Sequence, residues 1–367
     1  MSSSLRPRVL LGAPAPGGFA LPDAHPHAHT MYGPRGVWLD DDLLVVADTG
    51  NHRVMIWHGV PTRDHAAADV VLGQPDATTE GPATGGPEVG MRMPTGVIVT
   101  GGALVVADAW HHRLLVWESV PTATATPPDR VLLQPDLVAV EPNQGRPNAA
   151  AETAYWPYGI AMIDGRFHVA DTGNRRVLIW RGGLPEPGVP AEVVLGQPDA
   201  ASREENRGEG VGPASYRWPH AFAATGGGLL VADAGNHRLL HYTTHPDVDG
   251  PADLVIGQQS DDVSDEFPYM PQRGRIRFPY GLTRFGDGLA VADTANNRVV
   301  LTDRLPGAGR LVADTVLGQS DPHSGAENRG AGVLPDSMCW PYAVHGHGDV
   351  LVVADTGNNR VVVWERE

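Results

Sequence analysis

The sequence contains no lysine, and all 27 of its basic residues are arginine. Chemistry that needs an ε-amino group is therefore excluded, including Schiff bases, P-loop phosphate contacts and Ser-x-x-Lys nucleophiles. Cysteine is almost as scarce, since Cys339 is the only one. An intrachain disulfide cannot form, and metal sites built from several thiolates are excluded as well.

Long apolar runs are also missing. No run approaches the roughly 20 residues that a membrane helix needs, and Val9–Leu11 is too short for the core of a signal peptide. Acidic residues outnumber basic ones, 43 to 27, for a net charge of −16. A nucleic-acid partner needs a basic face. We therefore expect a cytoplasmic monomer that binds neither membrane nor nucleic acid.

Glycine and proline are abundant, with 45 and 33 of the 367 residues. Their combined share is well above the average of roughly 12%. The hydrophobic share of 41% is enough to build a core. This composition argues against a helical protein and favours many short strands joined by turns.

A sixfold repeat runs along the whole chain. Each copy starts at a proline, and neighbouring prolines are 60 to 63 residues apart. They are Pro34, Pro94, Pro157, Pro219, Pro279 and Pro341. An aspartate follows each proline by 14 residues, and an arginine follows each aspartate by five. The aspartates are Asp48, Asp108, Asp171, Asp233, Asp293 and Asp355, and the arginines are Arg53, Arg113, Arg176, Arg238, Arg298 and Arg360.

Each copy reads as four short strands, which in the first copy cover 36–39, 43–48, 53–57 and 69–74. A tight turn at 49–52 joins the second and third strands, where Gly and Asn favour turn geometry. Radial repetition of four antiparallel strands is typical of a β-propeller. We predict an all-β fold in which residues 1–367 form one six-bladed β-propeller domain.

The two ends of the sequence complement each other. The sixth copy stops after its third strand at Trp364, and residues 8–12 resemble the fourth strand at 69–73. Pairing the first strand with the last covers two sheet edges that would otherwise be exposed. We therefore expect residues 8–12 to complete the sixth blade.

The turn sequence Ala47–Val54 and its five copies resemble the NHL repeat family. The second copy, Ala107–Leu114, departs most from the pattern. The signatures Val71–Asp76 and Val194–Asp199 resemble a bacterial subgroup of that family, and the resemblance implies a role beside redox enzyme systems such as hydrogenases. Because propellers host many functions, the resemblance specifies the fold far better than the activity.

Residues present in all six copies are interpreted as structural, since one site does not need six copies. We expect each repeated aspartate to accept hydrogen bonds from turn amides and to pair with a repeated arginine. Trp57, Trp117, Trp180 and Trp364 close the third strands, and we expect them to pack between blades.

Function is sought where the symmetry breaks. In a propeller the loops between blades and the turns after each second strand share one face, here called the top face. The loops between blades are long, about 18 to 20 residues, and long loops on a rigid scaffold are a usual place for binding. The residue after each proline begins the innermost strand at the top mouth of the channel. These six residues vary, and they are Arg35, Thr95, Tyr158, His220, Tyr280 and Tyr342.

Three phenols, an imidazole and a guanidinium around one funnel suit a small polar or anionic ligand. The alternative is that the tyrosines only pack against neighbouring loops. A divalent metal such as zinc or copper is a second hypothesis, with His27, His29, His111 and His220 as candidate ligands. A resemblance to peptidyl-amidating lyases would imply a channel zinc held by three histidines. Only one inner position here is histidine, so that family is not matched.

Trp110 is the sharpest break in the repeat. The five equivalent positions hold Gly50, Gly173, Gly235, Ala295 and Gly357. We interpret glycine there as serving a positive φ, which is unfavourable for other residues. Trp110, His111 and His112 are therefore predicted as an asymmetric contact point for a ligand or partner. The alternative is that Trp110 folds beneath the loop 75–92 as a local plug.

Two functions remain open from the sequence. The first is a binding platform for a protein, a peptide or a small polar ligand at the top face. The second is an enzyme of lyase, hydrolase or cyclase type, built on Tyr158, His220, Tyr280, Tyr342 and Arg35. In that reading His220 is a general base or metal ligand, and Arg35 holds an anionic group. RNA binding, as in NHL domains of tripartite-motif proteins, is disfavoured by the negative charge.

Overall fold

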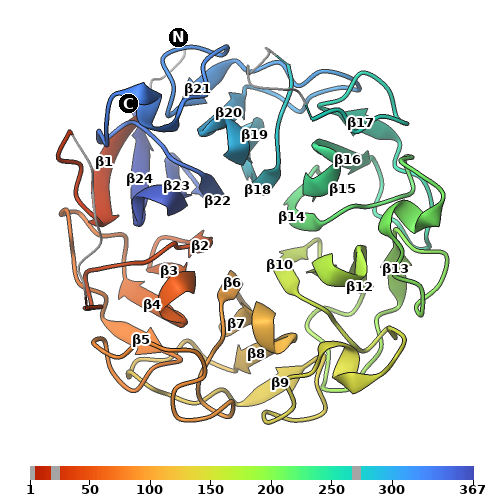
Figure 1. Ribbon diagram of the computed structural model, residues 1–367, viewed down its shortest axis with the longest axis horizontal. Helices are drawn as coiled ribbons and strands as arrows, with labels where there is room; N and C mark the ends of the chain where they lie inside the picture. Colours follow the sequence, from red (N-terminus) through yellow and green to blue (C-terminus); the bar gives the residue numbers. More distant parts are fainter. Residues whose placement is uncertain (1–4, 18–24, 267–273) are drawn as a thin grey trace.

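The computed structural model describes residues 5–17, 25–266 and 274–367. Its strands form six sheets of four strands, and the sheets stand in a ring around a central channel (Figure 1). Neighbouring strands within each sheet are antiparallel, and the first strand of each repeat is innermost. The predicted six-bladed all-β propeller is confirmed.

Five blades take their four strands in chain order. Blade 1 contains β2 (Gly36–Leu39), β3 (Leu43–Asp48), β4 (Arg53–His58) and β5 (Val70–Leu72). Blade 2 contains β6 (Pro94–Thr100), β7 (Ala103–Asp108), β8 (Arg113–Trp117) and β9 (Arg130–Leu132). Blade 3 contains β10 (Pro157–Ile163), β11 (Arg166–Asp171), β12 (Arg176–Trp180) and β13 (Val193–Leu195). Blade 4 contains β14 (Pro219–Ala224), β15 (Leu229–Asp233), β16 (Arg238–Tyr242) and β17 (Leu254–Ile256). Blade 5 contains β18 (Pro279–Phe285), β19 (Gly288–Asp293), β20 (Arg298–Thr302) and β21 (Thr315–Leu317).

Blade 6 joins the two ends of the chain. It contains β22 (Pro341–His347), β23 (Val350–Asp355), β24 (Arg360–Arg366) and, as its outer strand, β1 (Leu5–Gly12). β1 pairs antiparallel with β24, and it begins earlier than the predicted 8–12 because Leu5 already pairs with Arg366. Closure of the ring by an N-terminal strand is thus the observed arrangement.

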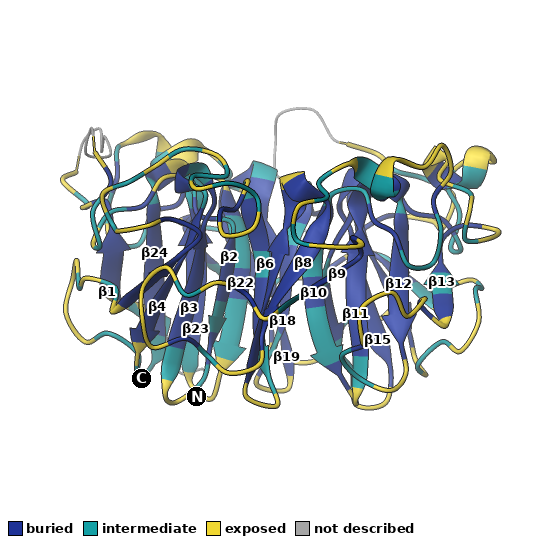
Figure 2. Ribbon diagram, turned by 90° about the horizontal axis from the view of Figure 1, so that it is seen from below, coloured by how far each residue is buried: buried dark blue, intermediate teal, exposed yellow. Residues whose placement is uncertain are grey.

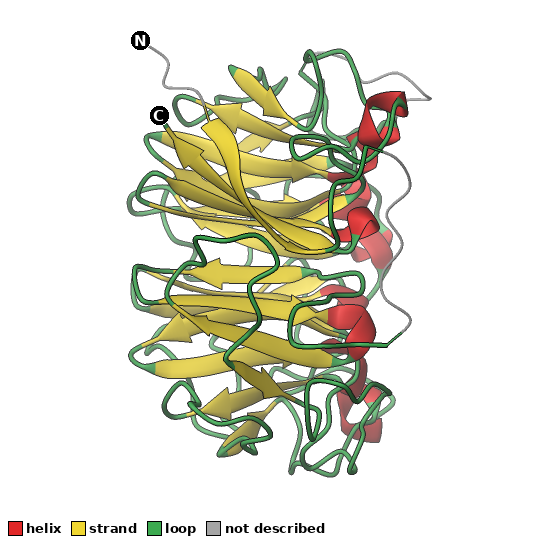
Figure 3. Ribbon diagram, turned by 90° about the vertical axis from the view of Figure 1, so that its left-hand side faces the viewer, coloured by secondary structure: helices red, strands yellow, loops and turns green. Residues whose placement is uncertain are grey.

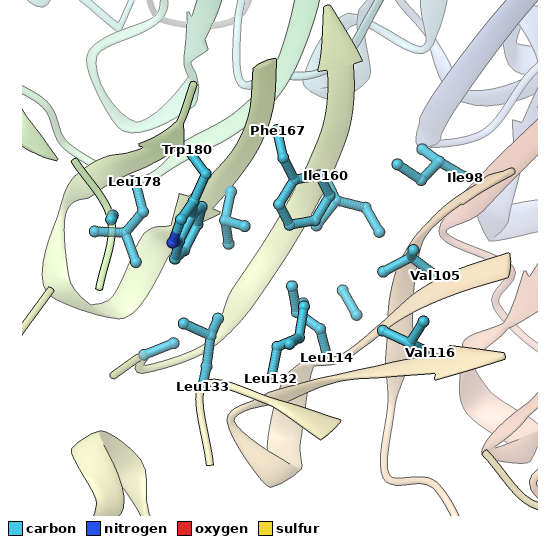
Figure 4. Packing of buried hydrophobic residues seen from close by; sticks show 14 residues of the cluster. Ile98, Val105, Leu114, Val116, Leu132, Leu133, Ile160, Phe167, Leu178 and Trp180 are labelled. Carbon is cyan, nitrogen blue, oxygen red and sulfur yellow. The ribbon is translucent and has the colours of Figure 1, made fainter. Parts of the chain in front are cut away.

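The hydrophobic core is divided into six clusters, each shared by two neighbouring blades. Figure 4 shows the cluster between blades 2 and 3, where Leu114 and Val116 face Phe167 and Trp180. The strand-ending tryptophans belong to these clusters, as predicted from their repeat. Burial is therefore concentrated between the sheets, while exposed residues gather in the loops of both faces (Figure 2).

All turns between second and third strands are short 3-10 segments, and they lie on one face (Figure 3). The first of them is η1 (Thr49–Asn51). β1 begins and β24 ends at the opposite face (Figure 3). Within the described ranges, no helix is long and apolar enough to cross a membrane.

A buried ion pair repeats in every blade between the aspartate that ends the second strand and the arginine that starts the third. The arginine Nε lies 2.7–2.9 Å from the aspartate Oδ2 in all six copies. In blade 1, Arg53 also donates to the carbonyls of Thr30 and Ala77, one in each flanking top loop. The pair is therefore the anchor of the long top loops.

The Gly-Gln-Pro-Asp signature after the outer strand has a structural role too. The Gln74 side-chain amide donates to the carbonyls of His52 and Gly81, which ties the turn to the top loop. The Asp76 carboxylate accepts from the backbone N–H groups of Thr78 and Thr79. These bonds explain why the outer strand is shorter than predicted, ending at Leu72 and not at residue 74.

Candidate functional site

The central channel contains a cavity of about 320 Å³, lined by the six inner strands. All six residues predicted from the variable position after each proline line it: Arg35, Thr95, Tyr158, His220, Tyr280 and Tyr342. This volume lies at the lower end of the range for small-molecule sites. The cavity therefore has room for a compact ligand.

Inner strands approach one another closely at the top mouth, and the sequence reflects this. A Cβ on Gly36 would lie 1.7 Å from the carbonyl oxygen of Thr95, and one on Gly159 would lie 1.8 Å from that of His220. Glycine at these positions lets adjacent inner strands pack against the site residues. The backbones of adjacent inner strands therefore lie close together at this level of the channel.

Four aromatic rings form a continuous arc around the mouth, from blade 6 through blade 3. Tyr342 and Tyr280 are stacked with ring centroids 4.3 Å apart. Tyr280 lies 4.4 Å from His220, and His220 stacks on Tyr158 at 4.9 Å. The sequence identified these residues by position, and the structure brings them into direct contact.

His220 is held in one orientation by two hydrogen bonds. Its Nδ1 lies 2.9 Å from the carbonyl oxygen of Trp218, which can only accept, so Nδ1 carries the proton. Nε2 is then an acceptor and lies 3.3 Å from the Tyr342 hydroxyl. Burial, with a smaller contribution from nearby Arg35, lowers the pKa of His220 to about 4. The imidazole is therefore neutral at pH 7.

Burial raises the pKa values of the three tyrosines, so their hydroxyls stay protonated. The pKa of Tyr280 rises to about 12 and that of Tyr342 rises well above its usual value. Burial also raises the pKa of Tyr158, while a hydrogen bond with the Trp110 side chain acts in the opposite direction. Tyr158 and Tyr280 can therefore donate hydrogen bonds to a ligand, whereas the Tyr342 O–H is already directed at His220 Nε2.

Arg35 is the cation at the mouth. Its guanidinium carbon lies 4.9 Å from the Tyr342 ring centroid, in a cation–π contact. Among the described residues, Arg35 forms no ion pair with a carboxylate. Thr95 contributes less, because its hydroxyl donates to the Tyr158 carbonyl at 2.9 Å and its side chain is buried.

Trp110 lies in the turn η2 (Ala109–His111), between β7 and β8 of blade 2. Its ring centroid is 5.6 Å from that of Trp156, and the Arg92 guanidinium lies 5.6 Å from the Trp110 ring. The side chain is 37% exposed. This exposure argues against a fully buried plug, although Arg92, the last residue of the loop 75–92, lies over the ring.

The interpretation of glycine at the Trp110 position was wrong. Positive φ occurs two residues later, at His112 (φ 55°), and not at residue 110. Glycine is favoured because a Cβ on Gly50 would lie 2.5 Å from the carbonyl oxygen of Tyr32. The backbone hydrogen bond to that carbonyl is 2.7–2.8 Å long at the four glycines but 3.1–3.2 Å at Trp110 and Ala295. A Cβ is thus accommodated by a slightly wider turn.

His111 and His112 have framework contacts. His111 Nδ1 lies 2.8 Å from Asp108 Oδ2, the place that asparagine takes in the other blades. His112 Nδ1 accepts the backbone N–H of Trp156 at 3.1 Å. Burial lowers the pKa of His112 to about 4. Neither residue lines the channel cavity.

The four candidate metal ligands are not brought together. His27 and His29 stack on each other with centroids 5.5 Å apart, and Arg53 binds the His27 backbone carbonyl. His111 is engaged by Asp108, and His220 is the only one of the four that lines the channel. The described part of the chain has no group of three His, Cys, Asp or Glu side chains placed to hold a metal ion. These residues do not fit a single zinc or copper site.

Sequence reasoning missed Trp38 and His345, which also line the cavity. Both are on inner strands, three residues beyond the positions of Arg35 and Tyr342, and their rings lie 5.9 Å apart. Burial lowers the pKa of His345 to about 4. The signal was available in the sequence, because inner strands expose several successive residues to a channel.

Replacing Trp110 with glycine tests its role in stability. Since the ring is partly exposed and lies outside the blade cores, Trp110→Gly should cost about 1 kcal/mol or less in the free energy of unfolding. Urea titration of both proteins measures this difference. A loss above about 3 kcal/mol, typical of buried aromatics, would restore the plug interpretation.

Comparison with known proteins extends the description only at the level of the fold. No protein-family model matches the sequence, and no curated protein matches it either. Among solved structures, virginiamycin B lyase from Staphylococcus aureus is 10% identical with a TM-score of 0.47, covering 93% of this chain and 98% of that one. A Thermus thermophilus protein described as a putative oxidoreductase (glucose dehydrogenase) is 14% identical with a TM-score of 0.49, covering 99% of each chain. These comparisons assign no function to the chain, and NHL membership stays a prediction.

Proposed function

We propose that this propeller is a binding module whose channel mouth takes a small organic anion with an aromatic or apolar body. The observation that carries the proposal is Arg35, a half-buried guanidinium with no carboxylate partner among the described residues, beside protonated phenols. A guanidinium binds a carboxylate in bidentate geometry. We also propose that the chain is an NHL-repeat protein, on the turn sequences described above.

The surroundings of Arg35 favour an anion over a cation or a neutral sugar. The Tyr280 hydroxyl is held protonated and can donate a hydrogen bond to an anion, and the neutral His220 adds no charge of either sign. The rings stack at 4.3–4.9 Å and provide an apolar wall for the rest of the ligand. Because the chain carries a net charge of −16, the positive charge of Arg35 makes the channel mouth a local site that favours anions.

The enzyme hypothesis is the second candidate, supported by the Tyr342 hydroxyl directed at His220 Nε2. A general base works best when its pKa is near the operating pH. The pKa of His220, about 4, makes it a weak proton acceptor at pH 7. The geometry therefore supports binding better than acid–base catalysis, and a protein or peptide partner at the top face remains a separate prediction.

Benzoate is a suitable probe, since it combines a carboxylate with a flat ring. We expect saturable binding by isothermal titration calorimetry, and an affinity roughly 10- to 100-fold weaker in Arg35→Met, from the loss of a charge-assisted contact. Benzyl alcohol, which lacks the charge, should not distinguish the two proteins.

Arg92→Met is the matched control, because Arg92 is an exposed arginine over an aromatic ring on the same face but outside the cavity lining. It should bind benzoate as the wild type does. Equal benzoate affinity in the wild type and Arg35→Met would refute an anion site at the mouth.

A further inference from the structure

Five blades have a loop between the third and fourth strands that covers the outer strand of the preceding blade. Three of these loops donate a backbone N–H to the carbonyl of one equivalent residue, at 2.8–2.9 Å: His65 to Leu10, Ala125 to Val71 and Gly309 to Val255. The blade 3 loop contacts β9 through the Pro185 carbonyl, which accepts from the Arg130 side chain, and the blade 4 loop contacts Gly196, just after β13, through the Asp249 carboxylate. Covering the outer strand is thus a general feature of this ring.

The same loops accept hydrogen bonds from the N–H groups of buried indoles. In blades 1 to 3, the tryptophan that ends the third strand donates its Nε1–H to a loop carbonyl nine residues later, at 3.0–3.1 Å. These pairs are Trp57 with Ala66, Trp117 with Thr126 and Trp180 with Val189. Each loop therefore binds both the indole of its own blade and the strand of its neighbour.

The boundary between blades 5 and 6 lacks this cover. In blade 6 the third strand, β24, pairs with β1 as the fourth, and no loop among the described residues joins the two. Val316 of β21 corresponds to Val71 in register, and among the described residues nothing bonds to its outward-facing backbone N–H and carbonyl. Trp364 is 3% exposed, and its Nε1 has no hydrogen-bond partner among those residues.

A large groove opens at this boundary. Its volume is about 980 Å³, and both Val316 and Trp364 line it. A buried N–H without a partner costs about 1–3 kcal/mol, and an uncovered strand edge is a template for pairing. The groove shares no lining residue with the channel cavity.

We propose that the groove between blades 5 and 6 binds an extended segment of a partner polypeptide, which takes the place of the covering loop. The segment donates a backbone N–H to the Val316 carbonyl, accepts the Val316 N–H, and presents a carbonyl to Trp364 Nε1. This is β-strand addition to a sheet edge. Three arginines and three aspartates line the groove, so an uncharged segment suits it: Arg6, Arg329, Arg366, Asp287, Asp303 and Asp336.

The loop of blade 2 shows what such a segment looks like. Thr124 Oγ1 accepts the Val71 N–H, Ala125 N–H donates to the Val71 carbonyl, and the Thr126 carbonyl accepts from Trp117. Residues 119–128 carry no charged side chain and include three prolines. Proline favours extended chains and lowers the entropy lost on binding.

A capped, fluorescently labelled peptide with the sequence of residues 119–128 is the probe. We expect saturable binding to the intact protein by fluorescence anisotropy, titrated to millimolar concentration. The peptide should also slow hydrogen exchange at the Val316 amide, while the amide of Val71, already covered, should be unchanged. A peptide with proline in place of Ala125 lacks the donating N–H and should not bind.

Trp364→Phe removes the indole N–H and keeps an aromatic ring, and it should weaken the peptide roughly three- to tenfold. Trp117→Phe is the matched control, because that indole is already satisfied; it should lower the Tm without changing peptide affinity. The proposal is overturned by equal binding of both peptides, by no binding, or by a Val316 amide that is as protected as Val71 in the free protein. A dimer in sedimentation that the peptide dissociates would also overturn it, by naming a second copy as the occupant.

Discussion

Removing residues 1–14 should destabilise the whole ring, because β1 is the outer strand of the closing blade. Val9, Leu10 and Leu11 are each at least 92% buried and pack against both neighbouring blades. Burying such a side chain contributes about 1.5–3 kcal/mol. The truncation should therefore cost roughly 5–9 kcal/mol, comparable with the total stability of many domains, and calorimetry should show a Tm lower by about 10 °C or more.

The matched control moves the strand rather than deleting it. Leu5 pairs with Arg366 in the antiparallel register of β1 and β24. A short Gly-Ser linker after Glu367, followed by residues 1–14, can therefore place the strand in the same position. This variant should recover most of the Tm. An unchanged Tm in the truncated protein would contradict closure by β1.

The architecture was predictable because each repeat carries its own local signals. The Pro–Asp–Arg spacing defined six blades, and the alternation of apolar runs with Gly-Asn turns defined the strands, so that β2 and β3 begin and end as predicted. The outer strands were predicted too long, because Gln74 and Asp76 direct their hydrogen bonds into the turn and loop rather than into a ladder. Side-chain bonds of this kind leave no periodic signal.

The site was only partly predictable for a related reason. Position in the repeat placed Tyr158, His220 and Tyr280 at the mouth, since every blade contributes the same place. The contact of His220 with Tyr342 depends on the distance between two blades, and the two residues are 122 positions apart in the chain. The glycines at the positions equivalent to Trp110 were misinterpreted. Glycine is favoured both where a backbone carbonyl lies close and where φ is positive, so the sequence alone does not distinguish the two causes.

Asp171→Ala should be among the most damaging single substitutions outside the hydrophobic clusters. The Asp171 carboxylate accepts from Arg176 Nε at 2.7 Å, from the Asn174 amide at 2.8 Å and from the Tyr155 backbone N–H at 2.7 Å. Its removal leaves the Arg176 guanidinium, which is fully buried, without a counter-charge. Breaking a buried pair from one side typically costs about 3–5 kcal/mol. Chemical denaturation of the variant measures this loss.

Two comparisons distinguish a buried charge from a general effect of mutation. Glu118→Ala removes an exposed partner of Arg130 at 2.6 Å and should cost less than about 1 kcal/mol, because exposed pairs are weak. The double variant Asp171→Ala with Arg176→Met removes both charges and should be more stable than Asp171→Ala alone. It should nevertheless release the top loops to faster proteolysis, since Arg176 donates to the carbonyls of Ala150 and Ala200 on either side of blade 3. If Asp171→Ala lowers the free energy of unfolding no more than Glu118→Ala does, the repeated pair does not anchor the loops. The loops must then be ordered by contacts such as those of Gln74 and Asp76.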